Sequence, residues 1–162
     1  MIHLIVGNTG SGKTTYANKL KQENKGIIFS IDKWNNTLFL SDKKEEDGLE
    51  WFLERINRAE TLIMDLIIQL ENANTHSILD LGLSKKEHRD KFKKFAISNG
   101  YEIRLHFLDI SKEIRWERVK QRNNEKGVSY EFDVSQADFD FMETWFEKPN
   151  DDELKDGIII RT

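Results

Sequence analysis

Residues 7–14 read GNTGSGKT, a glycine-rich segment whose residue types and spacing could bind phosphate. The segment satisfies the pattern GxxxxGK[ST], in which glycines let backbone N–H groups wrap the phosphates, the lysine reaches the β- and γ-phosphates, and the hydroxyl group binds Mg²⁺. A nucleoside triphosphate such as ATP is the ligand that this chemistry favours. The residues expected to bind it are Gly7, Asn8, Thr9, Gly10, Ser11, Gly12, Lys13, Thr14 and Thr15.

The residues on either side of this segment fit a phosphate-binding loop. Residues 2–6 (IHLIV) form an almost continuous apolar run, which is typical of a strand buried on both faces of a parallel sheet. A helix is expected to begin near Lys13 and to end near Glu23. A loop between such a strand and such a helix is the context in which this motif binds phosphate.

Two aspartates are expected at the carboxyl ends of other strands, where open α/β sheets bind their ligands. Asp32 ends the apolar run at 27–31 and could accept the proton of an attacking hydroxyl group. The alternative is that Asp32 caps a helix over the residues that follow it. Asp80 follows Ile78 and Leu79, and it could hold Mg²⁺ through water or orient an acceptor.

Three arginines, Arg115, Arg118 and Arg122, could neutralise charge on a phosphoryl group during its transfer. They lie at i, i+3 and i+7 of a helix that Ser111 is expected to cap, so all three project from one face. We expect a lid at about residues 115–130 that carries them over the nucleotide. The alternative is a solvated face on which the arginines pair with neighbouring glutamates.

Strand-like and helix-like segments alternate along the rest of the chain. Strands are expected at residues 2–6, 27–31, 77–81, 101–107 and 157–161. Helices are expected at residues 13–23, 49–70, from a Ser84–Glu87 capping box to about residue 99, and after Ser111, with one short helix near Thr37 in a mobile segment at 33–48. This order predicts an α/β fold with a parallel sheet and helices on both faces.

Composition limits the classes of function. A chain of 162 residues fits one domain, expected to span 1–162, with 38% hydrophobic and 33% charged residues. No apolar run approaches the roughly 20 residues of a membrane span, and the net charge of −4 gives no general attraction to nucleic acid. The absence of cysteine and of a secretory segment before the first strand is compatible with a cytoplasmic location.

Several segments together resemble the small P-loop kinases: the phosphate-binding loop, Asp32, ILDLG at 78–82 and RVKQRN at 118–123. This group includes the kinase domain of phage polynucleotide kinase, zeta toxins and chloramphenicol phosphotransferase. The segment FDVSQADFDFMETWFEKPNDDE is similar to the tail of bacterial AAA-family ATP-binding proteins regarded as predicted kinases. The resemblance covers nearly the whole chain. It implies a three-layer P-loop fold with a five-stranded parallel sheet of order 2-3-1-4-5.

The resemblance also implies roles for individual residues. Asp32 would be the base that activates the acceptor hydroxyl, while Lys13 and Thr14 would be the phosphate and metal ligands. Asp80 would orient the acceptor, and Arg122 would be the arginine of the lid.

The function predicted from these residues is transfer of the γ-phosphate of Mg-ATP to a hydroxyl group of a small-molecule or nucleotide-like acceptor. Polynucleotide kinase carries an arginine three residues after its base, where this chain has Asn35, so a nucleic acid acceptor is not favoured, although Lys33 lies close by. The alternative function is a nucleotide-dependent ATPase or regulatory switch that makes no phosphorylated product.

Overall fold

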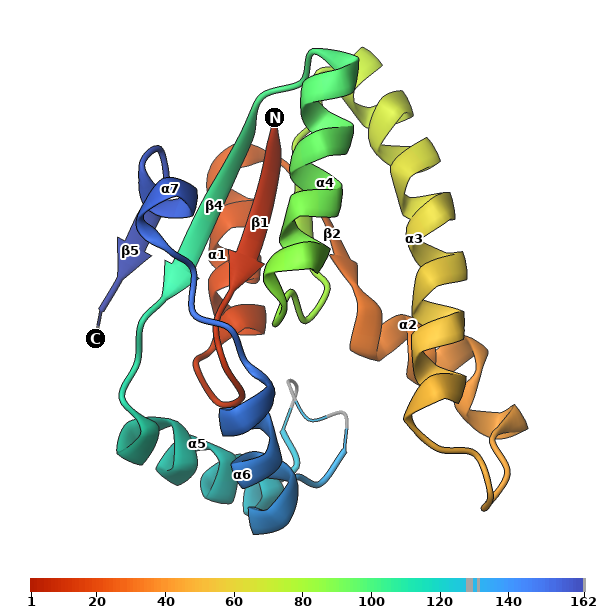
Figure 1. Cartoon of the computed structure of the whole chain (residues 1–162), viewed down its shortest axis with the longest axis vertical. Coiled ribbons are helices and arrows are strands. Elements are labelled where there is room, and N and C mark those ends of the chain that lie inside the picture. The colour runs from red at the N-terminus through yellow and green to blue at the C-terminus, as the bar shows by residue number, and fades with distance from the viewer. Residues whose placement is uncertain (128–129, 131, 162) are drawn as a thin grey trace.

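The computed structural model describes residues 1–127, 130 and 132–161, which form a parallel sheet with helices on both faces (Figure 1). Strands and helices alternate as the sequence predicts. The elements are β1 (Ile2–Val6), α1 (Lys13–Asn24), β2 (Ile27–Ser30), α2 (Ile31–Leu38), the 3-10 helix η1 (Leu40–Asp42), α3 (Leu49–Asn72), β3 (Ser77–Asp80), α4 (Lys86–Asn99), β4 (Ile103–Leu108), α5 (Lys112–Glu125), α6 (Gln136–Trp145), α7 (Asp151–Leu154) and β5 (Ile158–Ile160).

The strand order is β2-β3-β1-β4-β5, and every neighbouring pair is parallel. This confirms the order implied by the resemblance. Because the strands are parallel, their carboxyl ends meet at one edge of the sheet, where Ser30 of β2 lies opposite Asp80 of β3. The phosphate-binding loop leaves β1 at the same edge, since β1 lies between β3 and β4.

The core lies on both faces of the sheet because β1 alternates its side chains between them. Ile2, Leu4 and Val6 pack in a cluster with residues of α3 and α4, whereas Ile5 packs in a second cluster with residues of α1. All four side chains are buried. The central strand therefore fixes the position of the loop that follows it.

A chain of polar rings crosses the α1 face of the sheet. The imidazole of His3 lies 2.9 Å from that of His106 on one side and 2.9 Å from that of His76 on the other. The hydroxyl of Tyr16, on α1, lies 2.9 Å from the second ring nitrogen of His106. Burial lowers the pKa of His3 to about 3 and that of His106 to about 4, so both rings are neutral near pH 7.

The end of β2 differs from the sequence prediction. The strand stops at Ser30, which is the N-cap of α2, and Asp32 lies within the first turn of that helix. The predicted strand over 27–31 was therefore one residue too long, and the interpretation of Asp32 as a helix cap is wrong. The helix buries Ile31 and, one turn later on the same face, Asn35.

The predicted capping box between Ser84 and Glu87 is also wrong. Helix α4 begins at Lys86, and the side chain of Ser84 donates to the carbonyl oxygen of Gly82 instead. A residue distant in sequence replaces the local cap, because the carboxylate of Glu147 accepts from the backbone N–H of Lys86 at 2.8 Å. By contrast, Ser111 caps α5 as expected.

No helix in the described part of the chain is long and apolar enough to cross a membrane. The longest, α3, has 24 residues, and charged side chains recur along it.

Candidate active site

The loop between β1 and α1 has a backbone that only glycine adopts readily at two positions. Gly10 has φ +79° and Gly12 has φ +91°, and both lie in the left-handed region. Gly12 is also the N-cap of α1, and its cap makes no side-chain hydrogen bond, so the helix N-terminus is presented to the loop by backbone alone. This geometry places N–H groups where a phosphate can bind.

Lys13 stands in the middle of the charged groups that the sequence singled out. Its ammonium donates to the carbonyl oxygens of Gly7, at 2.9 Å, and Asn8, at 3.4 Å. Burial lowers the pKa of Lys13, and the carboxylates of Asp80 and Asp32 partly oppose that shift. The predicted lysine and both predicted aspartates therefore come together at one edge of the sheet.

Thr14 and Asp80, the two predicted metal ligands, are joined by a hydrogen bond. The hydroxyl of Thr14 donates to a carboxylate oxygen of Asp80 at 2.9 Å, and Asp80 is buried at the end of β3. Oxygen ligands suit Mg²⁺, which proteins usually hold through one or two side chains and the phosphates of the substrate. The described residues contain no group of three or more histidine, cysteine, aspartate or glutamate side chains that could hold a metal ion.

Asp32 lies on the opposite wall of the site, exposed in the first turn of α2. Its negative charge raises the pKa of Lys13, which indicates that the two side chains are close enough to interact. Asn35, one turn further along α2, is buried, and its side-chain oxygen has no hydrogen-bond partner within the described residues. Helix α2 therefore contributes two polar side chains to this region, the carboxylate of Asp32 and the amide of Asn35.

The three arginines of α5 lie near the phosphate-binding loop. Arg118 donates to the carbonyl oxygen of Ser11 at 3.4 Å, and the positive charges of Arg122 and Arg115 both lower the pKa of Lys13. The Nε of Arg122 is buried without a hydrogen-bond partner in the described part of the chain.

The solvated-face interpretation is wrong for Arg115, which is 6% exposed and forms its ion pair with Glu143 of α6. The lid expected at about 115–130 stays a prediction. Helix α5 occupies its first part, and residues 128 and 129 lie outside the described residues.

Sequence reasoning missed Glu143. This residue is on α6, and its carboxylate accepts from the side-chain amide of Asn8 at 2.6 Å and from both terminal nitrogens of Arg115. A signal for the helix existed, because Ser135 and Asp138 form a capping box at its start. Nothing in the spacing pointed to Glu143 itself, because its partner Asn8 is 135 residues away.

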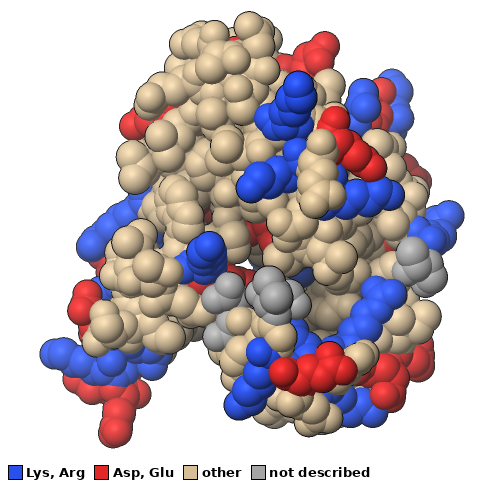
Figure 2. Space-filling model, turned by 180° about the vertical axis from the view of Figure 1, so that it is seen from behind, with Lys and Arg blue, Asp and Glu red and all other residues tan. Residues whose placement is uncertain are grey.

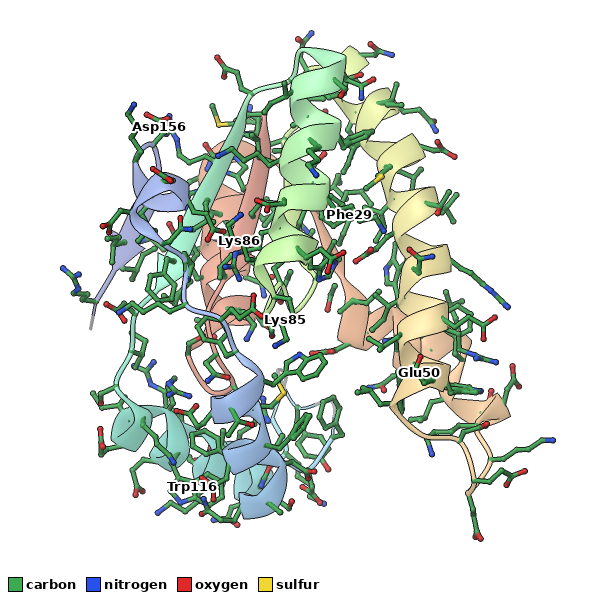
Figure 3. All side chains as sticks on the ribbon, viewed as in Figure 1. Phe29, Glu50, Lys85, Lys86, Trp116 and Asp156 are labelled. Carbon is green, nitrogen blue, oxygen red and sulfur yellow. The ribbon has the colours of Figure 1, made fainter. Side chains whose placement is uncertain are left out.

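A hollow lies beside this edge of the sheet. In the space-filling view it opens between the part formed by α2 and α3 and the part formed by α5 and α6, with basic side chains at its margin and acidic ones deeper (Figure 2). Lys85, from the loop before α4, points toward this space (Figure 3). Its ammonium lies 4.3 Å from the ring centre of Trp145 and 3.1 Å from a carboxylate oxygen of Glu147.

A phosphate-binding loop between a central parallel strand and a helix, with a hydroxyl bonded to an aspartate on the adjacent strand, defines a P-loop nucleotide-binding fold. The sheet order is that of the small P-loop kinases. A family model described as an AAA domain matches residues 2–149, so the chain belongs to that AAA domain family. A search of curated proteins gives no match.

Solved structures share this fold across nearly the whole chain. Kti12 from Chaetomium thermophilum in complex with ADP-AlF3 matches with a TM-score of 0.72 and 16% identity, over 99% of this chain and 89% of that chain. A putative kinase from Chloroflexus aurantiacus matches with a TM-score of 0.71 and 14% identity, over 99% and 87%. The APS kinase CysC from Mycobacterium tuberculosis, in complex with AMPPNP and APS, matches with a TM-score of 0.64 and 15% identity, over 99% and 87%.

Proposed function

We propose that the protein transfers the γ-phosphate of Mg-ATP to a hydroxyl group of a small-molecule or nucleotide-like acceptor. The observation that carries this proposal is the hydrogen bond between Thr14 and Asp80 beside Lys13. It joins the hydroxyl of the phosphate-binding loop to the aspartate of the adjacent strand, the pair that P-loop enzymes use to hold their metal ion. A requirement for ATP favours the cytoplasm as the place of this reaction.

The nucleotide would lie along residues 7–15, with its phosphates against the backbone N–H groups at the start of α1. Lys13 would exchange its carbonyl partners for the β- and γ-phosphates. Mg²⁺, when bound, would neutralise phosphate charge. Thr14 and Asp80 are the residues that would hold it, directly or through water.

The transfer would proceed by attack of the acceptor oxygen on the γ-phosphorus. A bond forms between that oxygen and phosphorus, the bond from phosphorus to the bridging oxygen breaks, and its electron pair leaves with ADP. The proton of the acceptor hydroxyl passes to the carboxylate of Asp32. Arg122 and Arg118 would neutralise charge on the phosphoryl oxygens; the Nε of Arg122 has no hydrogen-bond partner within the described residues.

Two of the solved structures support the class of substrate. The APS kinase holds AMPPNP together with APS, a nucleotide-like acceptor, and another match is a sugar kinase from Janibacter with a TM-score of 0.62 and 18% identity. A hydroxyl acceptor of small-molecule or nucleotide-like type is consistent with both.

One observation favours a second candidate function, a nucleotide-dependent ATPase or switch. Kti12, which was solved in complex with ADP-AlF3, is not named as a kinase, unlike the Chloroflexus and Mycobacterium proteins. An ATPase of this kind would use water in place of the acceptor, and the same residues would hold the nucleotide.

The test is a phosphoryl-transfer screen with ATP labelled at the γ-phosphate and a panel of sugars, nucleosides, nucleotides and other alcohols. We expect labelled product with at least one acceptor class, and loss of that product in the Asp80→Asn and Lys13→Ala variants. Lys21→Ala, an exposed position on the same helix, is the matched control. Label released only as inorganic phosphate would favour the ATPase, and the absence of ATP binding would contradict both functions.

A further inference from the structure

We propose that Arg115 and Glu143 form a neutral clamp that positions the phosphate-binding loop, in which Arg115 keeps the carboxylate of Glu143 from repelling the nucleotide. Arg115 lies on α5 and Glu143 on α6, and both side chains contact the loop. This inference rests on the proposed function, because it takes a nucleoside triphosphate as the ligand of the loop.

Arg115 uses its guanidinium group almost entirely on fixed partners. Its Nε donates to the carbonyl oxygen of Ile110 at 3.0 Å, and one terminal nitrogen donates to the carbonyl oxygen of Thr9 at 3.1 Å. The two terminal nitrogens bind the two carboxylate oxygens of Glu143 at 2.6 and 2.9 Å. Such a forked pair fixes orientation as well as distance. Arg115 is therefore a positioning residue, which acts through Glu143 and the backbone of Thr9.

Glu143 reaches the loop by a second route. Its carboxylate accepts from the side-chain amide of Asn8 at 2.6 Å, and the other end of that amide accepts from the backbone N–H of Thr9 at 2.7 Å. Arg115 holds the carbonyl group of Thr9 from the same side. The two backbone groups of Thr9 are thus both hydrogen-bonded: its carbonyl oxygen to the guanidinium of Arg115, and its N–H to the side-chain amide of Asn8.

The next residue of the loop is held by shape. Gly10 packs so closely on α5 that a Cβ atom there would overlap the backbone carbonyl of Arg115. Three consecutive loop residues, Asn8, Thr9 and Gly10, therefore contact the clamp or the helix that carries it. Because these contacts are all made within the protein, they hold the loop conformation independently of a phosphate.

Because Glu143 is charged, this arrangement should affect the binding of ATP as well as the conformation of the loop. A carboxylate bonded to the loop lies close to the place of three phosphates, and a bare negative charge there would oppose ATP. Arg115 cancels it at contact distance, and its positive charge extends to the ammonium of Lys13, whose pKa it lowers. Removing the arginine alone should therefore be worse for ATP than removing both charges.

A double-mutant cycle tests this asymmetry. ATP affinity is measured by isothermal titration calorimetry for the wild-type protein, Arg115→Met, Glu143→Gln and the double variant, with Lys120→Met, an exposed lysine on α5, as the matched control. We expect Arg115→Met to weaken ATP binding by about tenfold or more, since it leaves the carboxylate of Glu143 beside the loop without its cation. Glu143→Gln should stay within about threefold of wild type, and the double variant should regain much of the lost affinity.

A second readout separates charge from packing. Repulsion by Glu143 grows with the charge of the ligand, so the defect of Arg115→Met should be larger for ATP than for AMP and should shrink at high salt. A double variant that binds ATP no better than Arg115→Met, with no dependence on ligand charge, would overturn the proposal and leave a packing role only.

If Arg115→Met does not fold, Arg115→Lys tests the same point, because it keeps the charge and loses the fork. Because the charge is kept, any loss of affinity in Arg115→Lys should be similar for ATP and AMP, and a loss clearly larger for ATP in a folded Arg115→Lys protein would overturn the clamp as a device of charge. Failure of the wild-type protein to bind ATP would instead contradict the proposed function.

Discussion

Helix α1 carries two polar clusters that differ in how completely their groups are paired. At its N-terminus, Lys13 lies among carboxylates and arginines, and buried polar atoms of Ser11, Asn35 and Arg122 have no hydrogen-bond partner within the described residues. One turn later, Tyr16 joins the row of histidines, in which each ring contact is closed at 2.9 Å. Within the described residues, the first cluster holds buried donors and acceptors without a partner, whereas the members of the second are joined ring to ring.

The difference follows from the cost of burying polar groups. A buried donor or acceptor without a partner costs about 1–3 kcal/mol, so native proteins rarely leave several in one place unless a ligand pairs with them. Neutral imidazoles can hydrogen-bond to one another without burying a charge. The histidine row therefore pairs its polar groups within the protein and needs no ligand. The phosphate-binding cluster is complete only with a ligand, and the two clusters should therefore respond to mutation in opposite ways.

The largest effect is expected for Lys13→Ala, which removes the cation at the centre of the charged cluster. Turnover should fall below detection, and ATP affinity should drop by roughly 10–100-fold, because hydrogen bonds to charged groups contribute about 1.5–3 kcal/mol. The melting temperature should stay close to wild type, because the lysine binds loop carbonyls and no core residue. Unchanged ATP affinity in calorimetry, with a normal melt, would show that the loop does not bind the phosphates.

Asp32→Asn should reduce phosphoryl transfer by about 10²–10⁴-fold, the usual contribution of a positioned base. Mg-ATP affinity should stay near wild type, and the melting temperature should shift by no more than a few degrees, since the side chain is exposed. Single-turnover kinetics with saturating ATP measures the effect. Transfer at the wild-type rate would mean that Asp32 is not the base, and loss of nucleotide binding would make it a metal ligand.

Arg122→Ala should lower the rate of transfer by about 10²–10³-fold and ATP affinity much less, because a donor of this kind acts chiefly where transition-state charge develops. Comparison of kcat with the ATP dissociation constant provides the test. Equal losses in both would assign Arg122 to ground-state binding. No change in either quantity would support the alternative interpretation, in which Arg122 belongs to a solvated charged face and has no role in transfer.

The histidine row should affect stability and leave ATP binding unchanged. His3 and His106 have a lowered pKa in the fold, about 3 and about 4, against 6.5 when unfolded, so the unfolded chain binds more protons below pH 6.5. Their contribution is fully present above pH 6.5 and is lost as the pH falls toward 4 and 3. Between pH 7 and pH 5 the loss should be on the order of 2 kcal/mol per histidine.

Urea unfolding at the two pH values measures this loss. His106→Gln should lose less stability between pH 7 and pH 5 than the wild-type protein does. An equal loss in the two proteins would assign the acid sensitivity to other groups.

The sequence predicted the strands, the loop and the charged residues around it, because each depends on local patterns or on a motif. It placed Asp32 at a strand end because an apolar run alone does not show where a strand gives way to a helix. Glu143 and the histidine row could not be predicted, because their partners are brought together by the sheet across more than 70 residues of sequence. Helix α6 is a different case, because the capping box that begins at Ser135 could have been recognised in the sequence.

The row of rings also restricts where its protons can be. A neutral imidazole has one N–H group, so if Tyr16 donates to His106, each ring must donate onward through Nε2, toward His3 and then His76. If Tyr16 accepts, every ring donates through Nδ1 in the opposite direction. While neutral, the three histidines therefore share one tautomer. Nitrogen-15 NMR of the imidazoles should show a single tautomeric form for all three, whose direction is chosen by one phenol proton.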